Sequence, residues 1–220
     1  DLSKTLNLTN TDFIRTTEKR HKRSVQNLWN VLKNNDDIYL STYSGWYSVS
    51  DEAFYSEDEI EEVDGSIRYI SSKTYVDLVD EESYFFRLSK WEKPLLNYYK
   101  ANPNFISPLS RKNEVISFVK NGLKDLSISR KSFSWGIKVP DDENHIIYVW
   151  LDALTNYLSA LNYPNLEDPL FKKFWPATTH LIGKDILRFH AVYWPAFLLA
   201  AKIPLPKNIY GHGWILSGDE

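Results

Sequence analysis

The last third of the chain alternates between two hydrophobic periodicities, and this alternation restricts the possible folds more than any other feature of the sequence. Continuous apolar runs at 145–150, 179–183 and 208–216 are typical of strands, whereas 151–161 and 186–202 repeat apolar residues at helical spacing. The order strand, helix, strand, helix, strand predicts a parallel sheet with helical crossovers. We therefore expect an α/β fold, in which ligands bind beyond the carboxyl ends of the strands.

Polar residues stand at the expected strand ends, where such a fold would hold a ligand. The first strand is expected to end at Trp150 and Asp152, and the second at Gly183 and Asp185. Gly183 would let the backbone approach a ligand closely, because it has no side chain. Asp152 has the simple interpretation of a helix N-cap, whereas Asp185 fits either an N-cap or a carboxylate that accepts hydrogen bonds from ribose hydroxyls.

The helix pattern at 186–202 carries residues that a simple core helix would avoid. His190 lies one turn after Ile186 and shares its face, although a lone histidine on an apolar helix is more often a core residue than a ligand. Trp194 lies a further turn along and is expected in the core. Pro195 falls well inside the pattern, so the helix should kink or restart there.

The N-terminal segment predicts a helix. Apolar residues repeat at helical spacing over 17–33, and Thr16 or Thr17 can cap the N-terminus. The basic run at 19–23 falls in the first turns of this helix and is expected to be a solvated face.

The middle of the chain predicts strands and then helices. The segment 38–49 is rich in Tyr, Val, Ile and Thr and is expected to form strands with a turn at Gly45. The acidic stretch 56–82 is expected to be a hairpin or an exposed loop. A Ser-x-x-Glu capping box at 89–92 predicts a helix that runs to about Ala101.

Composition excludes some classes of protein. The chain has 220 residues, no cysteine and five histidines without metal-ligand spacing, so disulfides and thiolate metal sites are impossible within it. The net charge of −3 gives no global attraction to nucleic acid, and no apolar run is long enough for a transmembrane helix. The absence of methionine indicates that the chain is a piece of a longer one.

Several long motifs together resemble one enzyme family, the methionyl-tRNA synthetases of class I. The resemblance covers nearly the whole chain, with the motifs in the family's order. They are "DFIRTT" (12–17), "GWYSVSDEAFY" (45–55), "EESYFFRLSKW" (81–91), "GLKDLSISR" (122–130), "YVWLDALTNY" (148–157), "IGKDILRFHAVYWPAFLLAA" (182–201) and "HGWIL" (212–216).

The resemblance implies a Rossmann-like nucleotide-binding sheet that is interrupted by an α+β connective insertion. Residues 1–40 resemble the end of the first half with its link, 41–128 the insertion, and 129–220 the second half. The two phosphate-handling signatures of the family lie outside this sequence, so the chain resembles an internal fragment that is inactive alone. It lacks the Cys-rich zinc knuckle, as the bacterial and mitochondrial branch does, which implies no zinc and a cytoplasmic or mitochondrial-matrix enzyme.

The resemblance also implies substrates and a methionine pocket. The full enzyme would join methionine to ATP, supplied as its Mg complex, and pass the methionyl group to methionine tRNA, which it would contact mainly through parts outside this chain. Tyr157 and His190 are the implied polar contacts, and Leu154 stands where other members have proline. Resemblance places eight residues at this pocket: Trp150, Ala153, Leu154, Tyr157, Ile186, Phe189, His190 and Trp194.

A second set is implied around the nucleotide. Arg130 is the candidate catalytic residue, positioned to steady the adenylate or the carboxylate. Lys184 fits either a structural or a phosphate-facing role. Resemblance assigns six residues to ATP or the adenylate: Gly183, Asp185, His212, Gly213, Trp214 and Ile215.

Two alternatives stay open. Another class I synthetase, for leucine, valine or cysteine, would share the sheet but not the set Trp150, Tyr157 and His190. A non-catalytic binding module derived from a synthetase would share the sequence without the activity. A panel of amino-acid activation assays on the full-length protein decides the first alternative, and finding whether the parent gene continues on both sides decides the second.

Overall fold

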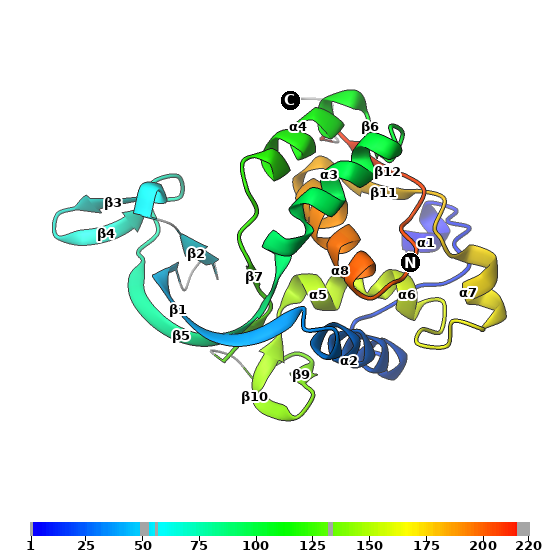
Figure 1. The fold of residues 1–220 in the computed structure, drawn as a ribbon, viewed down its shortest axis with the longest axis horizontal. Helices are drawn as coiled ribbons and strands as arrows, with labels where there is room; N and C mark the ends of the chain where they lie inside the picture. Colours follow the sequence, from blue (N-terminus) through cyan, green and yellow to red (C-terminus); the bar gives the residue numbers. More distant parts are fainter. Residues whose placement is uncertain (1, 49–52, 56, 132–133, 215–220) are drawn as a thin grey trace.

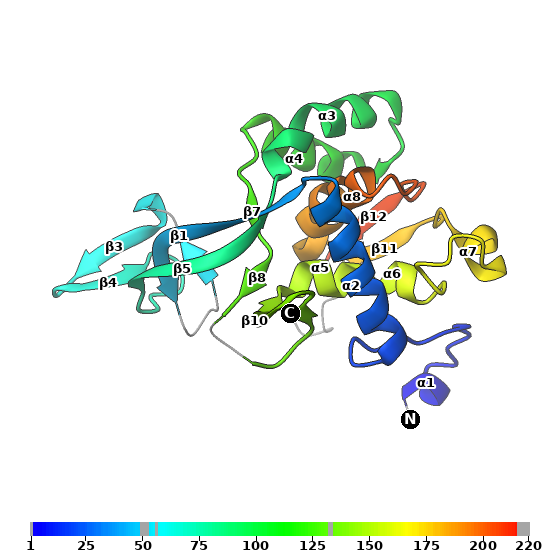
Figure 2. The same ribbon diagram turned by 60° about the horizontal axis from the view of Figure 1, so that its bottom comes forward.

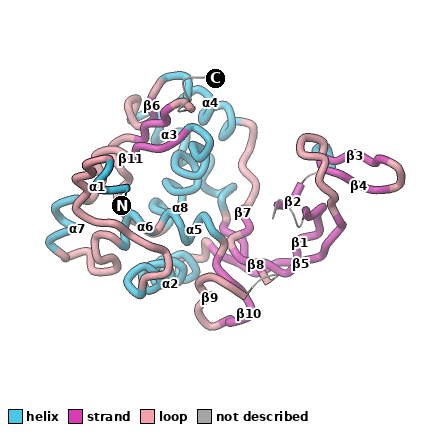
Figure 3. The backbone as a smooth tube through the Cα atoms, turned by 180° about the vertical axis from the view of Figure 1, so that it is seen from behind, coloured by secondary structure: helices cyan, strands magenta, loops and turns pink. Residues whose placement is uncertain are grey.

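A computed structural model describes residues 2–48, 53–55, 57–131 and 134–214 of the chain. Within these residues, a helix-rich body carries a long β-ribbon that extends away from it (Figure 1). Seen from behind, the strands of the ribbon lie to one side and most helices to the other (Figure 3). None of the described helices is long and apolar enough to cross a membrane.

A parallel sheet stands in the body, as the α/β prediction requires. Its order is β11 (His180–Gly183), β12 (Ile209–His212) and β6 (Ile106–Ser107), and both pairings are parallel. The runs expected at 179–183 and 208–216 thus supply two of its three strands, although 215 and 216 lie outside the described residues. The third strand, β6, precedes all three expected runs in the sequence. Sequence analysis missed it because it is only two residues long.

The apolar run at 145–150 does not join this sheet, and that expectation was wrong. β10 (Asp142–Ile147) pairs in antiparallel fashion with β8 (Ser129–Arg130) and β9 (Lys138–Val139). β10 is the central strand of this small antiparallel sheet, and only its second half is buried, unlike a strand of a parallel sheet that is covered on both faces. The strand ends at Ile147, so Trp150 and Asp152 lie in the following helix rather than at a strand end.

Short helices follow β10 and lead to β11. They are α5 (Val149–Leu154), α6 (Asn156–Ser159) and α7 (Pro169–Phe174), and the first two fall within the expected 151–161 helix apart from the first two residues of α5. Asp152 is not an N-cap, because Tyr148 occupies that position of α5. Asp152 lies in the first helical turn instead.

The helix expected at 186–202 changes its winding along its length. A 3₁₀ turn at Lys184–Ile186 leads to a π-helix at Phe189–Tyr193, and α8 (Trp194–Ala200) begins beside Pro195. The restart predicted at Pro195 is confirmed. Proline has no amide hydrogen, so the carbonyl of Ala191 one turn earlier loses its helical donor. The Tyr99 hydroxyl, from another helix, donates to this carbonyl over 2.6 Å.

Two helices, α3 and α4, lie at the top of the body in the view of Figure 1. α3 (Glu92–Ala101) carries Tyr99 and follows a 3₁₀ turn at Leu88–Trp91, and α4 (Leu109–Lys120) comes next. The helix to Ala101 is confirmed, but its capping box is not formed. The Ser89 hydroxyl donates to Asp125 over 2.6 Å instead of capping the helix.

The N-terminal part forms α1 (Leu2–Thr5) and α2 (Lys19–Asn34). The long helix agrees with the expected 17–33 helix, but its N-cap is Glu18 and not Thr16 or Thr17. The Glu18 carboxylate accepts hydrogen bonds from the Arg15 amide and the Arg20 side chain, which orders the approach to the helix.

The ribbon is built on two long antiparallel strands, β1 (Ile38–Ser48) and β5 (Asp77–Phe86). The turn expected at Gly45 is absent, because Gly45 pairs with Val79 inside the ladder. β2 (Ala53–Tyr55) and β7 (Leu126–Ser127) flank the long pair. The hairpin expected in the acidic stretch is confirmed as β3 (Ile60–Val63) and β4 (Ser66–Tyr69), after a 3₁₀ turn at Glu57–Glu59.

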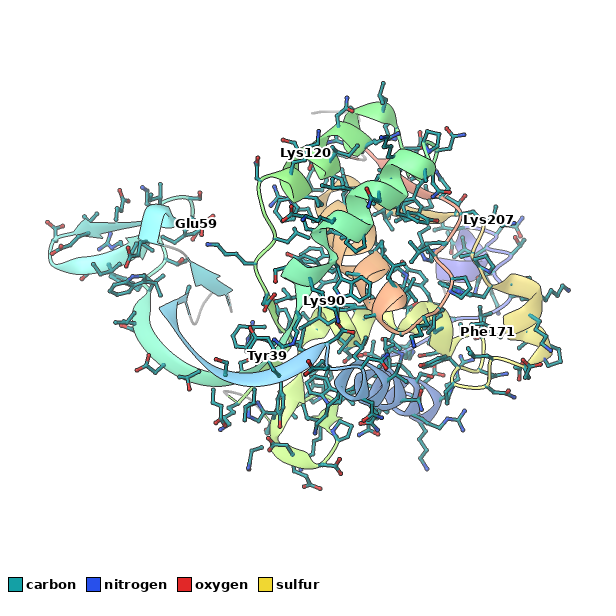
Figure 4. All side chains as sticks on the ribbon, viewed as in Figure 1. Tyr39, Glu59, Lys90, Lys120, Phe171 and Lys207 are labelled. Carbon is teal, nitrogen blue, oxygen red and sulfur yellow. The ribbon has the colours of Figure 1, made fainter. Side chains whose placement is uncertain are left out.

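One apolar core runs through the body, between α2, the parallel sheet and the helices that cover it (Figure 4). The ribbon contributes to it at its base, where Phe86 is fully buried. The Phe86 ring meets the Phe197 ring edge to face, with centroids 4.8 Å apart. Phe86, the last residue of β5, therefore packs the base of the ribbon against α8.

Phe86→Ala should lower the free energy of unfolding by about 3–5 kcal/mol, because it removes a buried ring and leaves a cavity. Denaturant unfolding of the natural gene product measures this loss. Phe174→Ala is the matched control, because Phe174 is 46% exposed and should cost less than about 1 kcal/mol. Similar losses for both substitutions would contradict the assigned place of Phe86 in the core.

Candidate active site

A cluster of aromatic and imidazole rings lies beneath the end of β11. The Tyr157 ring of α6 stacks on the His180 ring of β11, with centroids 4.0 Å apart. The Tyr157 hydroxyl lies 2.8 Å from Nε2 of His190, on the π-helix. Trp194 donates its indole N–H to Nε2 of His180 over 3.3 Å. Residues from four elements thus form two hydrogen-bonded pairs, which the stacking of Tyr157 on His180 joins into one cluster.

The direction of the hydrogen bonds in this cluster follows from its one obligatory acceptor. Nδ1 of His190 lies 2.9 Å from the carbonyl oxygen of Ile186, which can only accept. Nδ1 therefore carries the proton, and a neutral His190 accepts at Nε2 from the Tyr157 hydroxyl. Both donors of the pair are engaged within the protein.

Burial keeps these groups uncharged. It lowers the pKa of His180 to about 3, with a further contribution from the nearby His190. Burial also lowers the pKa of His190, although the hydrogen bond to the Ile186 carbonyl opposes the shift. Burial raises the pKa of the Tyr157 hydroxyl to about 12. The polar end of the cluster is neutral at neutral pH, which suits a neutral ligand.

A second aromatic pair joins α5 to the π-helix. The Trp150 ring of α5 stacks on the Phe189 ring with centroids 3.5 Å apart and planes 8° from parallel. Tyr193 meets Phe189 edge to face at 5.5 Å. Trp150 and Phe189 are only partly buried and pack against the core, so they form an aromatic wall rather than part of its interior.

The carboxyl ends of β11 and β12 bring the predicted nucleotide residues together. Gly183 pairs with His212 across the two parallel strands. A side chain at Gly183 would place its Cβ only 2.4 Å from an oxygen of Asp185, so glycine is required for the carboxylate to rest there. The Lys184 ammonium lies 4.9 Å from the centre of the Trp214 ring. Ile215 lies outside the described residues.

Asp185 is not a helix cap. The N-cap of the 3₁₀ turn at Lys184–Ile186 is Gly183, and no side chain caps it. Among the described residues, the exposed Asp185 carboxylate makes no hydrogen bond or ion pair. The structural alternative from the sequence therefore fails, and the carboxylate remains free to accept from a ligand.

Arg130 is held mainly by its own strand region. Its guanidinium donates to the Ser127 hydroxyl over 2.6 Å and to the Ser129 carbonyl over 2.7 Å. It also lies 4.1 Å from the centre of the Tyr148 ring, and only 5% of the residue is exposed. These contacts fix the short turn at 127–130, where β7 leads into β8.

A buried network that the sequence did not predict links α2 to α5 and α6. His21 is fully buried, and its Nε2 lies 2.6 Å from an Asp152 oxygen. Its Nδ1 lies 2.9 Å from the Ser159 hydroxyl. The pair His21 and Asp152 is 131 residues apart in sequence, so no local pattern could reveal it.

A cavity of about 470 Å³ opens beside the first turn of α5. Its walls come from the end of β10, the first turn of α5, the loop at 134–136 and the segment before α2. Ala153 and Asp152 face it from α5, so it borders the predicted methionine residues. The lining comprises Thr16, Trp135, Gly136, Ile146, Ile147, Tyr148, Val149, Asp152 and Ala153.

The predicted methionine residues fall into the two ring groups and the cavity wall. Tyr157, His190 and Trp194 form the hydrogen-bonded cluster, while Trp150 and Phe189 form the aromatic wall. Leu154 is 1% exposed and lies in the core. Sequence reasoning missed three further residues, His180, Trp175 and His21. A single sequence gives no sign of which side chains far apart along the chain will meet in the fold. Trp175 belongs to the cluster, with its ring 6.1 Å from His180.

No group of three metal-ligating side chains occurs in the part of the chain that the structure describes. The candidate site is therefore one of aromatic rings, neutral imidazoles and a free carboxylate. Such a set can hold an apolar side chain and a hydroxyl-bearing ligand.

Comparison with known proteins identifies the class of this fold and site. A family model described as "tRNA synthetases class I (M)" matches residues 1–66 and 66–220. The chain belongs to this family of class I tRNA synthetases.

Individual relatives are methionine-specific members. The chain is 59% identical to the methionine–tRNA ligase of Rickettsia bellii, covering 95% of this chain and 40% of that protein. It is 54% identical to the Brucella suis enzyme, covering 100% and 42%. The Mycobacterium tuberculosis methionyl-tRNA synthetase bound by methionyl-adenylate superposes with a TM-score of 0.89 at 52% identity, covering 96% and 42%. The chain thus spans about two fifths of its relatives.

The lowered pKa of His180 predicts a specific loss of stability in acid. The unfolded chain binds a proton at this imidazole near pH 6.5, whereas the folded protein binds it only near pH 3. The free energy of unfolding should therefore decrease as the pH falls from about 6.5 toward 3, by up to about 1.4 kcal/mol per pH unit from this group.

Urea unfolding of the natural gene product at several pH values measures this slope. His180→Gln cannot titrate, so it should flatten the slope whatever it does to stability at neutral pH. If wild type and variant lose stability in parallel over this range, His180 is not held neutral by burial.

Proposed function

We propose that the protein carrying this chain activates methionine with ATP to form methionyl-adenylate and then transfers the methionyl group to methionine tRNA. One observation carries the proposal. Directly after β11, the 3₁₀ turn Lys184–Ile186 presents both the free Asp185 carboxylate and the Ile186 carbonyl that orients His190. A mixed anhydride of an amino acid and a nucleotide needs its two subsites this close together.

The ring cluster supports methionine as the amino acid. A thioether is apolar, polarisable and a weak acceptor, so it favours aromatic walls and a neutral polar end. Trp150, Tyr157 and His190 supply these, with Ile186 at the turn. Because the Tyr157 hydroxyl is already donated to His190, a sulfur atom would compete for that proton. Selectivity should therefore depend on shape more than on a strong hydrogen bond.

The strand ends support the nucleotide. Asp185 can accept from ribose hydroxyls, with Gly183 giving access. The proposal assigns His212, Gly213 and Trp214 to the adenine side, together with Ile215, which lies outside the described residues. Arg130 remains the candidate that steadies the adenylate or carboxylate, through the turn that its hydrogen bonds fix. Mg²⁺ would arrive with ATP. The absence of cysteine from the sequence supports a zinc-free enzyme.

The domain division extends the proposal to the whole chain. Residues 1–40 complete the first nucleotide-binding half and its link, 41–128 form the connective insertion, and 129–220 form the second half. The ribbon supports the first boundary, because the chain leaves the body along β1. It returns at the end of β5, and β6, within the proposed insertion, pairs with β12 in the parallel sheet of the body. The bacterial relatives favour a cytoplasmic enzyme.

Asp185→Ala should reduce kcat/KM for ATP roughly 10–100-fold, the effect of losing a hydrogen bond to a charged group at about 1.5–3 kcal/mol. Methionine-dependent ATP–pyrophosphate exchange by the natural gene product measures it. Thermal stability should stay close to wild type, because Asp185 caps no helix. Asp77→Ala removes another exposed carboxylate and should change neither quantity.

Gly183→Ala tests the close contact between Gly183 and the Asp185 carboxylate by changing the glycine instead of the aspartate. The added Cβ must displace the exposed Asp185 carboxylate, at little cost in stability. Its ATP defect should equal that of Asp185→Ala and should not add to it in the double variant. Full additivity of the two defects would show that Gly183 acts independently of Asp185.

His190→Leu should raise the methionine KM about fivefold, in line with about 1 kcal/mol for one hydrogen bond. It should also narrow the preference for methionine over norleucine and leave the ATP KM nearly unchanged. The reason is that the Tyr157 hydroxyl loses the acceptor that orients it. Exchange kinetics with both amino acids provide the measurement.

Tyr157→Phe should narrow the same preference, because it removes the only hydroxyl of the pair. Tyr163→Phe is the matched control, since Tyr163 is also a buried tyrosine but lies outside the ring cluster. An unchanged methionine-to-norleucine ratio in folded His190→Leu and Tyr157→Phe variants would leave both residues as ordinary core residues.

A further inference from the structure

A strip of connected hollows runs along α2, away from the candidate active site. The 470 Å³ cavity at Ala153 shares Trp135 and Gly136 with a second hollow of about 170 Å³. Lys22 joins that hollow to a third, of about 380 Å³. Arg23 joins the third to a fourth, of about 460 Å³. The hollows thus follow one another from α5 to the loop after α6, each sharing a lining residue with the next.

The middle of the strip is basic and rich in amides. Lys19, Lys22 and Arg23 are exposed, and within the described residues none of them forms an ion pair. They lie in the first turns of α2, where positive charge is unfavourable beside the positive end of the helix dipole. The same hollow is otherwise lined by carboxamide side chains, from Gln26, Asn27 and Asn30.

The carboxylates along the strip are engaged elsewhere. Asp152, which lines the first two hollows, is bonded to His21. Asp168, at the far end, accepts from the Leu170 amide and from Asn162. A strip with three unpaired cations in a chain of net charge −3 is complementary to an anionic polymer.

An exposed tryptophan stands where the basic part meets the cavity. Trp135 is 75% exposed. Its neighbour Gly136 has φ of +136°, and a Cβ there would lie 2.4 Å from Cγ2 of Ile146, so glycine lets this loop lie directly against β10. The Gln26 side chain donates to the Lys138 carbonyl over 3.2 Å, which ties the following strand to α2. The β9–β10 region lies beside α2 (Figure 2). The loop that leads into it therefore holds the exposed Trp135 ring close to this helix.

We propose that this strip binds the unpaired 3′ end of the tRNA, with Trp135 stacking on a base and Lys19, Lys22 and Arg23 contacting phosphates. Cations that follow the backbone and an aromatic ring for a base are the combination that binds single-stranded nucleic acid. The strip ends at Ala153, beside the proposed methionine pocket, where the terminal ribose must receive the methionyl group. This inference rests on the proposed function.

The first test removes the cations in the natural gene product. The triple variant Lys19→Ala, Lys22→Ala, Arg23→Ala should bind an acceptor-stem RNA hairpin with the unpaired 3′ nucleotides at least tenfold more weakly. The slope of log Kd against log salt should fall by about 2, at roughly 0.7 per phosphate contact. Methionine-dependent ATP–pyrophosphate exchange should be unchanged. The matched control carries Lys33→Ala, Lys100→Ala and Lys120→Ala, which remove three exposed cations outside the strip.

The second test separates stacking from charge. Trp135→Ala should weaken binding of the same hairpin about tenfold, within the range for losing one stacked base. Trp135→Phe should recover most of the loss, because it keeps an aromatic face. A blunt hairpin without the unpaired nucleotides should be indifferent to both substitutions.

Three outcomes would overturn the inference. They are unchanged RNA affinity in the strip variants, an equal loss in the control triple, or equal effects on the blunt and the overhanging hairpin. The proposed function fails separately, if the wild-type protein shows no methionine-dependent exchange. In that case, binding that requires the unpaired 3′ nucleotides and is lost in the strip variants would still support the assignment of the strip as a binding site for single-stranded RNA.

Discussion

The missing amide hydrogen of Pro195 is the constraint on which the site helix depends. Proline cannot donate to the Ala191 carbonyl, and the Tyr99 hydroxyl of α3 donates to it instead. Directly before Pro195 the winding widens, so that the Trp194 amide bonds to the Phe189 carbonyl in a π turn. That turn carries His190, whose Nδ1 reaches the Ile186 carbonyl. The hydroxyl of one tyrosine thus ties α3 to the helix that presents the candidate methionine contacts.

The ring cluster shows how buried polar side chains can have hydrogen-bond partners within the protein and still contribute to the choice of ligand. His190 donates to Ile186 and accepts from Tyr157, and His180 accepts from Trp194, so no charge is needed within the cluster. Burial lowers the pKa of both histidines, which keeps them neutral at neutral pH. The neutral, mutually bonded pair of Tyr157 and His190 offers a thioether no strong partner, and neither of its two N–H and O–H donors is left unpaired when the thioether is absent. Its contribution is a fixed shape with a weakly polar end.

Local sequence pattern predicted those parts of the structure that depend on neighbours along the chain. It gave the α2 helix, the strands β11 and β12, and the restart at Pro195. It failed for β10, since a short apolar run does not specify its partner strands, and for the caps at Thr16 and Ser89, where tertiary hydrogen bonds compete. The candidate site residues came from family resemblance. The residues alone left Asp185 and His190 undecided, and only the structure removes the helix-cap interpretation of Asp185.

The pairing of His21 with Asp152 lay beyond any such pattern, and it connects the two halves of the proposed chemistry. Asp152 can only accept, so Nε2 of His21 carries the proton between them, while Nδ1 faces Ser159. One fully buried imidazole thereby fixes α2 against α5 and α6. The basic face of α2 and the helices that carry Trp150, Ala153 and Tyr157 are then held as one unit. An RNA end guided along α2 would meet the methionine pocket at a distance set by this buried contact rather than by flexible surface loops.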